Sequence, residues 1–149
     1  MNLLNVILSV CITGIMSYFT ILNISSQKRD KKVFIIYLLI FIPLLILNCV
    51  YFEGITKLFL TIIFTTMVLY LTIFKKDISN SIYYTLSYEM LAFISEFIIS
   101  VAVLFSFKFD ASAYSNLPFS LLISSTLNSL LVYFTSKIKF VSKNIRKLN

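Results

Sequence analysis

The sequence contains no histidine among its 149 residues, and this absence excludes several kinds of chemistry. Histidine is a usual zinc ligand, the side chain that moves protons near neutral pH, and the base that activates a catalytic cysteine. The chain therefore lacks the parts of a Cys-His protease and the phosphate-accepting histidine of a sensor kinase. We expect no enzymatic activity, no metal site and no cofactor in these residues.

Cysteine and glycine occur only twice each. Cys11 and Cys49 lie in apolar stretches, where thiols behave as small hydrophobic groups, so we expect no disulfide framework. Gly14 and Gly54 cannot form the Gly-x-x-x-Gly pattern that lets two membrane helices approach closely. Serine, threonine and alanine are expected to make such close contacts instead.

Charged residues are also scarce, at 13% of the chain, whereas 59% is hydrophobic and the mean hydropathy is +0.95. A water-soluble domain needs a more polar surface, so we predict an all-α, polytopic membrane protein. Because a helix needs about 20 apolar residues to cross the hydrocarbon core, the chain has room for five transmembrane helices. The predicted spans are 3–24, 33–52, 58–74, 82–105 and 118–136, which form one domain over 1–136.

Lysine and arginine are concentrated where alternate spans end. Eleven of the thirteen lie within 28–32, 75–76 and 137–147, and only Lys57 and Lys108 lie in the other gaps. Because cytoplasmic loops are enriched in Lys and Arg, we predict an outside N-terminus and a cytoplasmic C-terminus in the cell (plasma) membrane. The first basic residue, Lys28, follows the first apolar stretch, so we expect that span to remain uncleaved.

The net charge of +7 is divided among loops and is not interleaved with base-stacking aromatic residues on one surface. We therefore expect the lipid bilayer and anionic inner-leaflet lipids as partners, and no nucleic acid.

Turn and break signals refine the expected spans. Pro43 is expected to kink the second helix, because it lacks an N–H group and its ring clashes with the preceding turn. Residues 53–57 are expected to form the first outer turn, and residues 106–117 the longest outer loop. A helix-start signal at 79–81 precedes the fourth span, and Pro118 opens the fifth. Aromatic residues at the start of the fourth span, Tyr83, Tyr84 and Tyr88, are expected to form an inner aromatic belt.

Two carboxylates lie inside the fourth span. Glu89 and Glu96 are seven residues apart, about two helical turns, so they share one face with Thr85, Ala92 and Ser100. An ionisable group at mid-span costs roughly 2.5 to 3.5 kcal/mol on insertion scales, so this face should point into the bundle. No Lys or Arg lies in any span to neutralise the two groups. Three interpretations of the two carboxylates remain open: hydrogen-bonded contacts between helices, a local water defect, or a site for a ligand, an ion or a conformational switch.

The fifth span supplies polar partners for this face. Ser120, Ser124 and Asn128 recur every four residues and form a stripe that should face protein. At 1.5 Å per residue, Glu96 and Asn128 each lie about 15 Å from the outer ends of their spans, so they could hydrogen-bond. Tyr133 is expected at the level of Glu89. The candidate ligand or switch residues are Glu89, Glu96, Asn128, Ser124 and Tyr133.

Residues 137–149 form a basic amphipathic tail, which is expected to be a cytoplasmic exit helix. A run of apolar residues spaced 4, 3, 4 and 3 positions apart predicts a heptad seam that continues the fifth helix. The residues of this signal exit are Phe134, Ile138, Val141, Ile145 and Leu148. Two interpretations remain open: a helix that lies on anionic lipid, or a stalk that pairs with a second copy in a homodimer and passes motion onward.

The fourth span reads SYEMLAFISEFIISVAVLFSF, and the basic exit reads SKIKFVSKNIRKLN. With five spans and short loops, the chain resembles the N-terminal transmembrane sensor region of accessory-gene-regulator-type peptide-pheromone histidine kinases. Their cytoplasmic half carries a GHKL-type ATP-binding domain, which is absent from these residues together with the phosphate-accepting histidine. The resemblance covers nearly all 149 residues and implies the input domain of a two-component, quorum-sensing system. It also implies that residues 53–57, residues 106–117 and the outer span ends receive an extracellular peptide, and that residues 137–149 transmit the signal.

Three functions follow from these features. The leading hypothesis is a non-enzymatic receptor in which an extracellular ligand shifts the fourth and fifth spans and the tail relays that shift to a cytoplasmic signalling module. The second is a small transporter or channel subunit that uses Glu89 and Glu96 for a cation or proton. The third is a membrane scaffold or immunity-type protein that binds another membrane protein laterally, for which no residue gives positive evidence.

Overall fold

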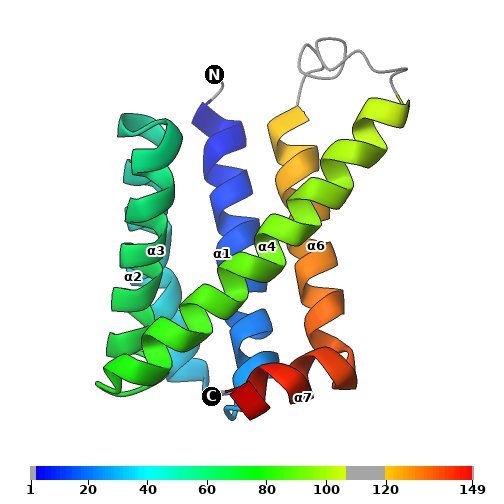
Figure 1. The fold of residues 1–149 in the computed structure, drawn as a ribbon. Helices are drawn as coiled ribbons and strands as arrows, with labels where there is room; N and C mark the ends of the chain where they lie inside the picture. Colours follow the sequence, from blue (N-terminus) through cyan, green and yellow to red (C-terminus); the bar gives the residue numbers. More distant parts are fainter. Residues whose placement is uncertain (1–2, 107–119, 149) are drawn as a thin grey trace.

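The computed structural model describes residues 3–106 and 120–148, except for the side chain at position 140. Every regular element in these residues is an α-helix, and the long helices form one bundle (Figure 1). The helices are α1 (Leu3–Ser25), α2 (Lys31–Tyr51), α3 (Gly54–Leu71), α4 (Ile78–Ser106), α6 (Ser120–Lys137) and α7 (Lys139–Leu148). The predicted all-α class is confirmed for the described residues.

The first four helices are each long and apolar enough to cross a membrane. Helix α6 meets the same standard only when it is joined to the segment Val141–Leu148, and the two are bent by 76° where they meet. The described residues therefore hold four candidate spans, or five if the bent pair is one broken span. Apolar helices of this length and number are typical of a membrane protein.

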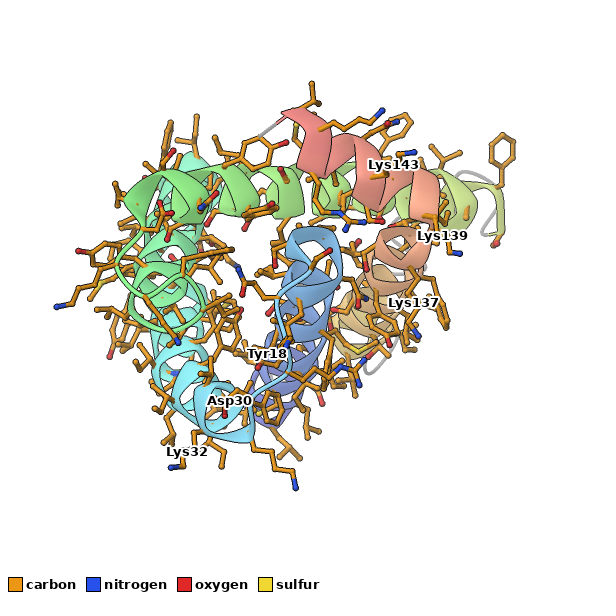
Figure 2. All side chains as sticks on the ribbon, turned by 90° about the horizontal axis from the view of Figure 1, so that it is seen from below. Tyr18, Asp30, Lys32, Lys137, Lys139 and Lys143 are labelled. Atoms are coloured by element: carbon orange, nitrogen blue, oxygen red, sulfur yellow. The ribbon has the colours of Figure 1, made fainter. Side chains whose placement is uncertain are left out.

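Helix α1 lies at the centre of the bundle and contacts α2, α4, α6 and α7 (Figures 1 and 2). Its buried residues include Tyr18, Ile21 and Ile24. The Tyr18 ring packs against Tyr37 of α2 with 5.3 Å between the ring centroids, and Tyr37 stacks on Phe41 at 5.0 Å. Burial of such large aromatic side chains fixes α2 against α1 near the point where the chain turns between them.

The outward faces of the helices carry large apolar side chains. Leu39 of α2 and Phe93 of α4 are 69% and 71% exposed. A soluble monomer rarely exposes apolar surface on this scale, whereas lipid-facing helices require it. The outer surface thus agrees with the composition in indicating a bilayer environment.

Helix α3 differs from the predicted third span at both ends. Helix α3 begins at Gly54, so residues 54–57 are helical and the turn after α2 contains only Phe52 and Glu53. Gly54 has a φ of +60°, a left-handed conformation that suits glycine at this abrupt start. At its other end α3 stops at Leu71. Residues 72–77 form an irregular connection of turns in which Ile73 and Phe74 are buried.

The start of the fourth helix also differs from the prediction. Asp77 caps α4, because its carboxylate accepts hydrogen bonds from the Asn80 backbone N–H at 3.1 Å and from the Asn80 side-chain amide at 2.6 Å. The helix therefore begins at Ile78, before the predicted start. Tyr84 and Tyr88 are buried in the core, so the predicted inner aromatic belt is wrong at these two positions. Helix α2 continues through Pro43, and the predicted start at Pro118 lies outside the described residues.

Three basic segments lie at one end of the bundle, which we call the basic end: 28–32, 75–76 and 137–147. Figure 2 views the molecule from this side. Contacts here join segments that are far apart in sequence, since the Arg146 guanidinium donates to the Ser26 hydroxyl and the Tyr83 hydroxyl donates to the Ile145 carbonyl. The tail is therefore packed against the ends of α1 and α4.

Helix α7 does not continue α6 in a straight line, so the predicted continuous seam is wrong. The 76° bend places Phe134 on α6, Ile138 at the break, and the other three seam residues on α7. Phe134 and Ile138 are 60% and 52% exposed, whereas Val141, Ile145 and Leu148 line a groove against α4. Val141 and Ile145 are half-buried and Leu148 is exposed, so the five residues do not form a straight stalk.

Candidate functional site between α4 and α6

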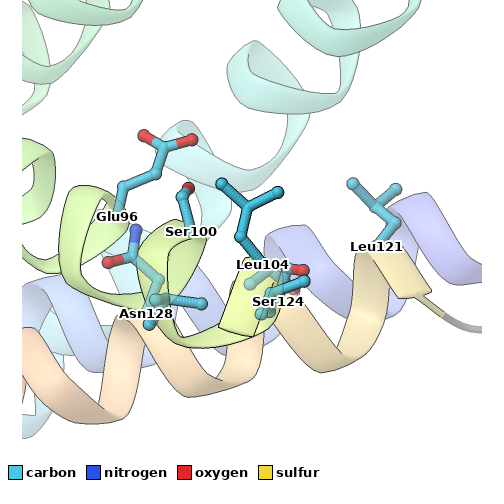
Figure 3. Close-up of a pocket in the computed structure, with 9 residues that line it drawn as sticks. Glu96, Ser100, Leu104, Leu121, Ser124 and Asn128 are labelled. Carbon is cyan, nitrogen blue, oxygen red and sulfur yellow. The ribbon is translucent and has the colours of Figure 1, made fainter. Parts of the chain in front are cut away.

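A cavity of about 480 Å³ lies between α4 and α6, in the halves of these helices that are away from the basic end (Figure 3). Helix α4 contributes Glu96 and Ser100 to its wall, and α6 contributes Ser124, Ser125 and Asn128. Four apolar residues complete the lining: Ile99, Val103, Leu104 and Leu121. Concave sites of 300 to 1,000 Å³ with apolar walls and a few convergent polar groups are the usual form of small-ligand sites.

The inclination of α4 creates this cavity. The helix crosses the bundle diagonally, so its first half packs beside α3 and its second half leans over α6 (Figure 1). Its buried residues are Ser81, Tyr84, Thr85, Tyr88 and Ser95, and none lies beyond position 95. The half of α4 that carries Glu96 and Ser100 therefore has few buried contacts, and both of these side chains are exposed at the cavity.

Helix α6 forms the opposite wall and is held by α1. Its Ser129 is buried, and the Ser129 and Thr13 hydroxyls lie 3.4 Å apart across the α1–α6 contact. The half-buried Asn128 side chain extends from this wall, and its amide points toward Glu96 in Figure 3. Among the described residues its buried Oδ1 atom has no hydrogen-bond partner. Ser124 and Asn128 of the predicted stripe thus border the cavity, and Ser129 beside the stripe contacts α1.

A second cavity, of about 250 Å³, shares Leu121 and Ser125 with the first. The half-buried Lys57 of α3 lines it, together with Thr61. The backbone here is braced by Asn48 of α2, whose fully buried amide donates to the Lys57 carbonyl at 3.0 Å and to the Thr61 hydroxyl at 2.7 Å. Adjoining cavities therefore carry one acidic and one basic side chain, from α4 and α3.

Glu89 lies nearer the centre of the bundle than Glu96 does. It is half-buried, its Oε1 atom is enclosed, and this atom has no hydrogen-bond partner among the described residues. The carboxylate is close enough to Tyr37 and Tyr88 to interact with them electrostatically. The like-charged Glu96 carboxylate also interacts with it electrostatically.

Other interior hydroxyls are equally unpartnered. Thr20, Thr65 and Thr85 are fully buried on α1, α3 and α4, and their hydroxyls make no hydrogen bond among the described residues. A buried polar group without a partner costs about 1 to 3 kcal/mol, so such groups are normally satisfied by water, an ion or a ligand. The bundle core therefore contains several polar groups with unused hydrogen-bonding capacity among the described residues.

The five candidate residues of the sequence analysis do not form one cluster. Glu96, Ser124 and Asn128 line the same cavity, and Glu89 lies two turns further along α4. Tyr133 contacts its own helix, with its ring 5.7 Å from that of Phe134 and 4.6 Å from the Lys137 ammonium. No described contact joins Tyr133 to Glu89.

Sequence reasoning placed Lys57 in the outer turn but not beside a cavity, and it missed the roles of Asn48 and Tyr37. Asn48 is a polar residue within an apolar stretch, which is a detectable signal, but its position near the end of the predicted span suggested an interface rather than a helix contact. Tyr37 is completely buried, and its hydroxyl lies 2.8 Å from the Ser17 hydroxyl. In the described residues no group of three or more His, Cys, Asp or Glu side chains could hold a metal ion.

Comparison of the chain with protein-family models, with curated proteins and with solved structures finds no match. The fold and the cavity therefore define the class as far as an α-helical protein with four to five long apolar helices, which is typical of membrane proteins.

Proposed function

We propose that this chain is a membrane-embedded sensor that binds an extracellular peptide in the cavity between α4 and α6. The chain would cross the membrane five times, with α6 as the fifth span and α7 as its cytoplasmic extension. The basic end would face the cytoplasm, because Lys and Arg favour that side. The cavity would then open toward the outer half of the bilayer.

One observation carries this proposal: an acidic side chain and an amide with unused hydrogen-bonding capacity line opposite walls of one cavity. Glu96 has no cationic partner in the described residues, and the Asn128 Oδ1 atom accepts no hydrogen bond. A ligand amine or guanidinium could interact with both groups. Lys57 in the adjoining cavity supplies the opposite charge, which suits a peptide because a peptide offers both amino and carboxylate groups.

The packing of α4 supports a route from this cavity to the tail. Ligand binding between α4 and α6 would change their separation, since the outer half of α4 has few buried contacts to resist movement. Helix α7 follows α6 directly and also contacts α4 through Tyr83 and Ile145. A ligand shifts such an equilibrium only by its difference in affinity for the two helix arrangements. The relay to a cytoplasmic signalling module, as in two-component quorum sensing, rests on the resemblance of the sequence.

Peptide binding by the purified chain in nanodiscs tests the proposal. A library of short peptides is offered to the wild type, to Glu96→Gln and to Asp77→Asn, and the retained peptides are identified by mass spectrometry. We expect cationic peptides to be retained by the wild type and by Asp77→Asn, because the exposed Asp77 carboxylate lies at the basic end, away from this cavity, and asparagine can also cap α4. Loss of a charge-assisted hydrogen bond should weaken binding to Glu96→Gln by about 10- to 100-fold. Equal retention by all three proteins contradicts the proposal.

A transporter or channel subunit is the second candidate, and the unpartnered interior groups favour it. Glu89, Thr65 and Thr85 lie in the core with unsatisfied oxygens, which could contact water or a passing cation. Ion uptake into liposomes separates the two functions. Uptake that depends on Glu89 and Glu96, combined with no selective retention of peptides, would replace the receptor proposal with transport.

A further inference from the structure

A third cavity, of about 400 Å³, lies at the basic end, where α1 ends and α2 begins. Its buried wall is apolar and consists of Tyr18, Leu22 and Ile73. Its exposed rim is polar and carries Ser26, Gln27, Lys28 and Lys75. An apolar interior beneath a cationic rim is a different chemistry from that of the cavity between α4 and α6.

The two lysines reach this rim from separate parts of the chain. Lys28 belongs to the loop between α1 and α2, and Lys75 belongs to the turn after α3. Ser26 and Lys75 have positive backbone φ values of 57° and 47°, which residues other than glycine rarely adopt. The backbone of the Lys75 turn is held by hydrogen bonds from Phe74 N–H to the Leu69 carbonyl and from Lys76 N–H to the Tyr70 carbonyl. The turn geometry thus places a cation at the rim at some conformational cost.

The one acidic residue that lines this cavity, Asp30, caps α2. The Asp30 carboxylate accepts a hydrogen bond from the Lys32 backbone N–H at 2.8 Å, which caps α2, and its carbonyl accepts one from the Tyr18 hydroxyl at 3.2 Å. Figure 2 shows Tyr18 and Asp30 near each other, with Lys32 pointing away from them. Lys28 and Lys75 remain as exposed donors with no ion pair among the described residues.

We propose that this cavity binds a phosphate group between Lys28 and Lys75, carried by an anionic lipid headgroup or by a soluble phosphate ester. Ammonium groups on both sides and the hydroxyl and amide of Ser26 and Gln27 match the charge and the acceptor oxygens of phosphate. The apolar wall would take the glycerol and acyl region of a lipid. Ser26 also accepts a hydrogen bond from Arg146, so an occupied cavity would lie beside the point where α7 is attached.

Lipid binding by the purified full chain tests this site. The protein in a neutral detergent is titrated with phosphatidylglycerol, and bound lipid is counted by native mass spectrometry. Lys28→Gln/Lys75→Gln should weaken binding roughly 10- to 30-fold. Each lysine near an anionic lipid contributes about 1 kcal/mol, which corresponds to about a fivefold change in Kd. Lys32→Gln/Lys76→Gln is the matched control, since it removes the same charge at the same end of the bundle from residues that do not line the cavity. This control should bind within about twofold of the wild type.

Further arms identify the source of the phosphate and verify folding. If inorganic phosphate or glycerol phosphate competes with the lipid at similar concentration, the site takes a soluble ester, and if neither competes, it takes a lipid. Lys28→Arg/Lys75→Arg keeps both charges and should retain binding, and it shows whether these positions tolerate substitution. Equal losses in the two Gln pairs, or no loss in either, overturn the proposal. None of these readouts depends on the cavity between α4 and α6.

Discussion

At the scale of single residues, hydroxyl and amide groups within the bundle join helices that are otherwise apolar. The Ser17 hydroxyl donates to the Gly14 carbonyl at 2.9 Å, so the Tyr37 hydroxyl must donate to Ser17 in their 2.8 Å contact. Asn48 makes the corresponding contact between α2 and α3 through Lys57 and Thr61. Because apolar helices gain little from associating within lipid, such hydrogen bonds help to determine which helix faces are in contact.

Tyr37→Phe should lower the free energy of unfolding by about 1 kcal/mol, because it removes the hydrogen bond to α1 and keeps the ring packing. Ser17 retains its own donated bond to Gly14, so no buried donor loses its partner. Tyr51→Phe is the matched control: Tyr51 is on the same helix and 73% exposed, so the same change should cost less than about 0.5 kcal/mol. Reversible unfolding in mixed micelles measures both values. Equal costs at the two positions would show that the buried contact contributes nothing.

The residue types of the candidate site could be predicted from the sequence, but their grouping could not. Two carboxylates within an apolar span mark an unusual helix face, and the four-residue stripe of α6 marks its partner. The distinct environments of Glu89 and Glu96 depend on the inclination of α4, which helical periodicity does not determine. The position of Lys57 at a cavity could not be predicted for the same reason, because only tertiary packing places the start of α3 beside Ser125 of α6.

At the scale of helices, apolar length predicted where the membrane helices are, and capping determined where they end. Helices α3 and α4 each begin about four residues before the predicted positions. At α4 the Asp77 cap determines the start, and hydropathy alone does not show such a cap. The bend between α6 and α7 was missed because heptad spacing remains the same across a break. Spacing records which residues are apolar and does not show whether the helix axis is continuous.

At this scale, alanine substitutions of the two glycines are expected to change stability in opposite directions. Gly54→Ala should destabilise the α2–α3 hairpin by about 1 kcal/mol, because a Cβ atom at a φ of +60° strains the backbone although nothing lies within 4 Å of it. Gly14→Ala should be neutral or slightly stabilising. Its Cβ would meet Ile42 and Phe41 at 3.4 Å, which is close contact, and alanine has the higher helix propensity. Unfolding free energies of the two variants should therefore differ in direction, and equal destabilisation would contradict this account of Gly54.

At the scale of the whole molecule, charge and packing agree on which ends of the helices lie together. The three basic segments, separated by about 40 to 60 residues in the sequence, meet at one end of the bundle, as the alternation of Lys and Arg predicts (Figure 2). The sequence could not predict that this end contains a cavity, or that α7 is attached to α1 there. Both depend on the bend after α6 and on the conformation of the turn at 72–77.

The number of crossings depends on α6, which has 18 residues and is therefore about 27 Å long, slightly less than a typical hydrocarbon core. It packs along α1, a helix that is apolar enough to span, so we expect α6 to cross the membrane beside it. Single cysteines in a chain with Cys11 and Cys49 replaced by alanine test this. Glu53→Cys and Ser106→Cys should react with an impermeant thiol reagent in intact cells, whereas Lys76→Cys and Lys147→Cys should react only after permeabilisation. Labelling of position 147 from the same side as position 106 would mean that α6 does not cross and that the chain has four spans.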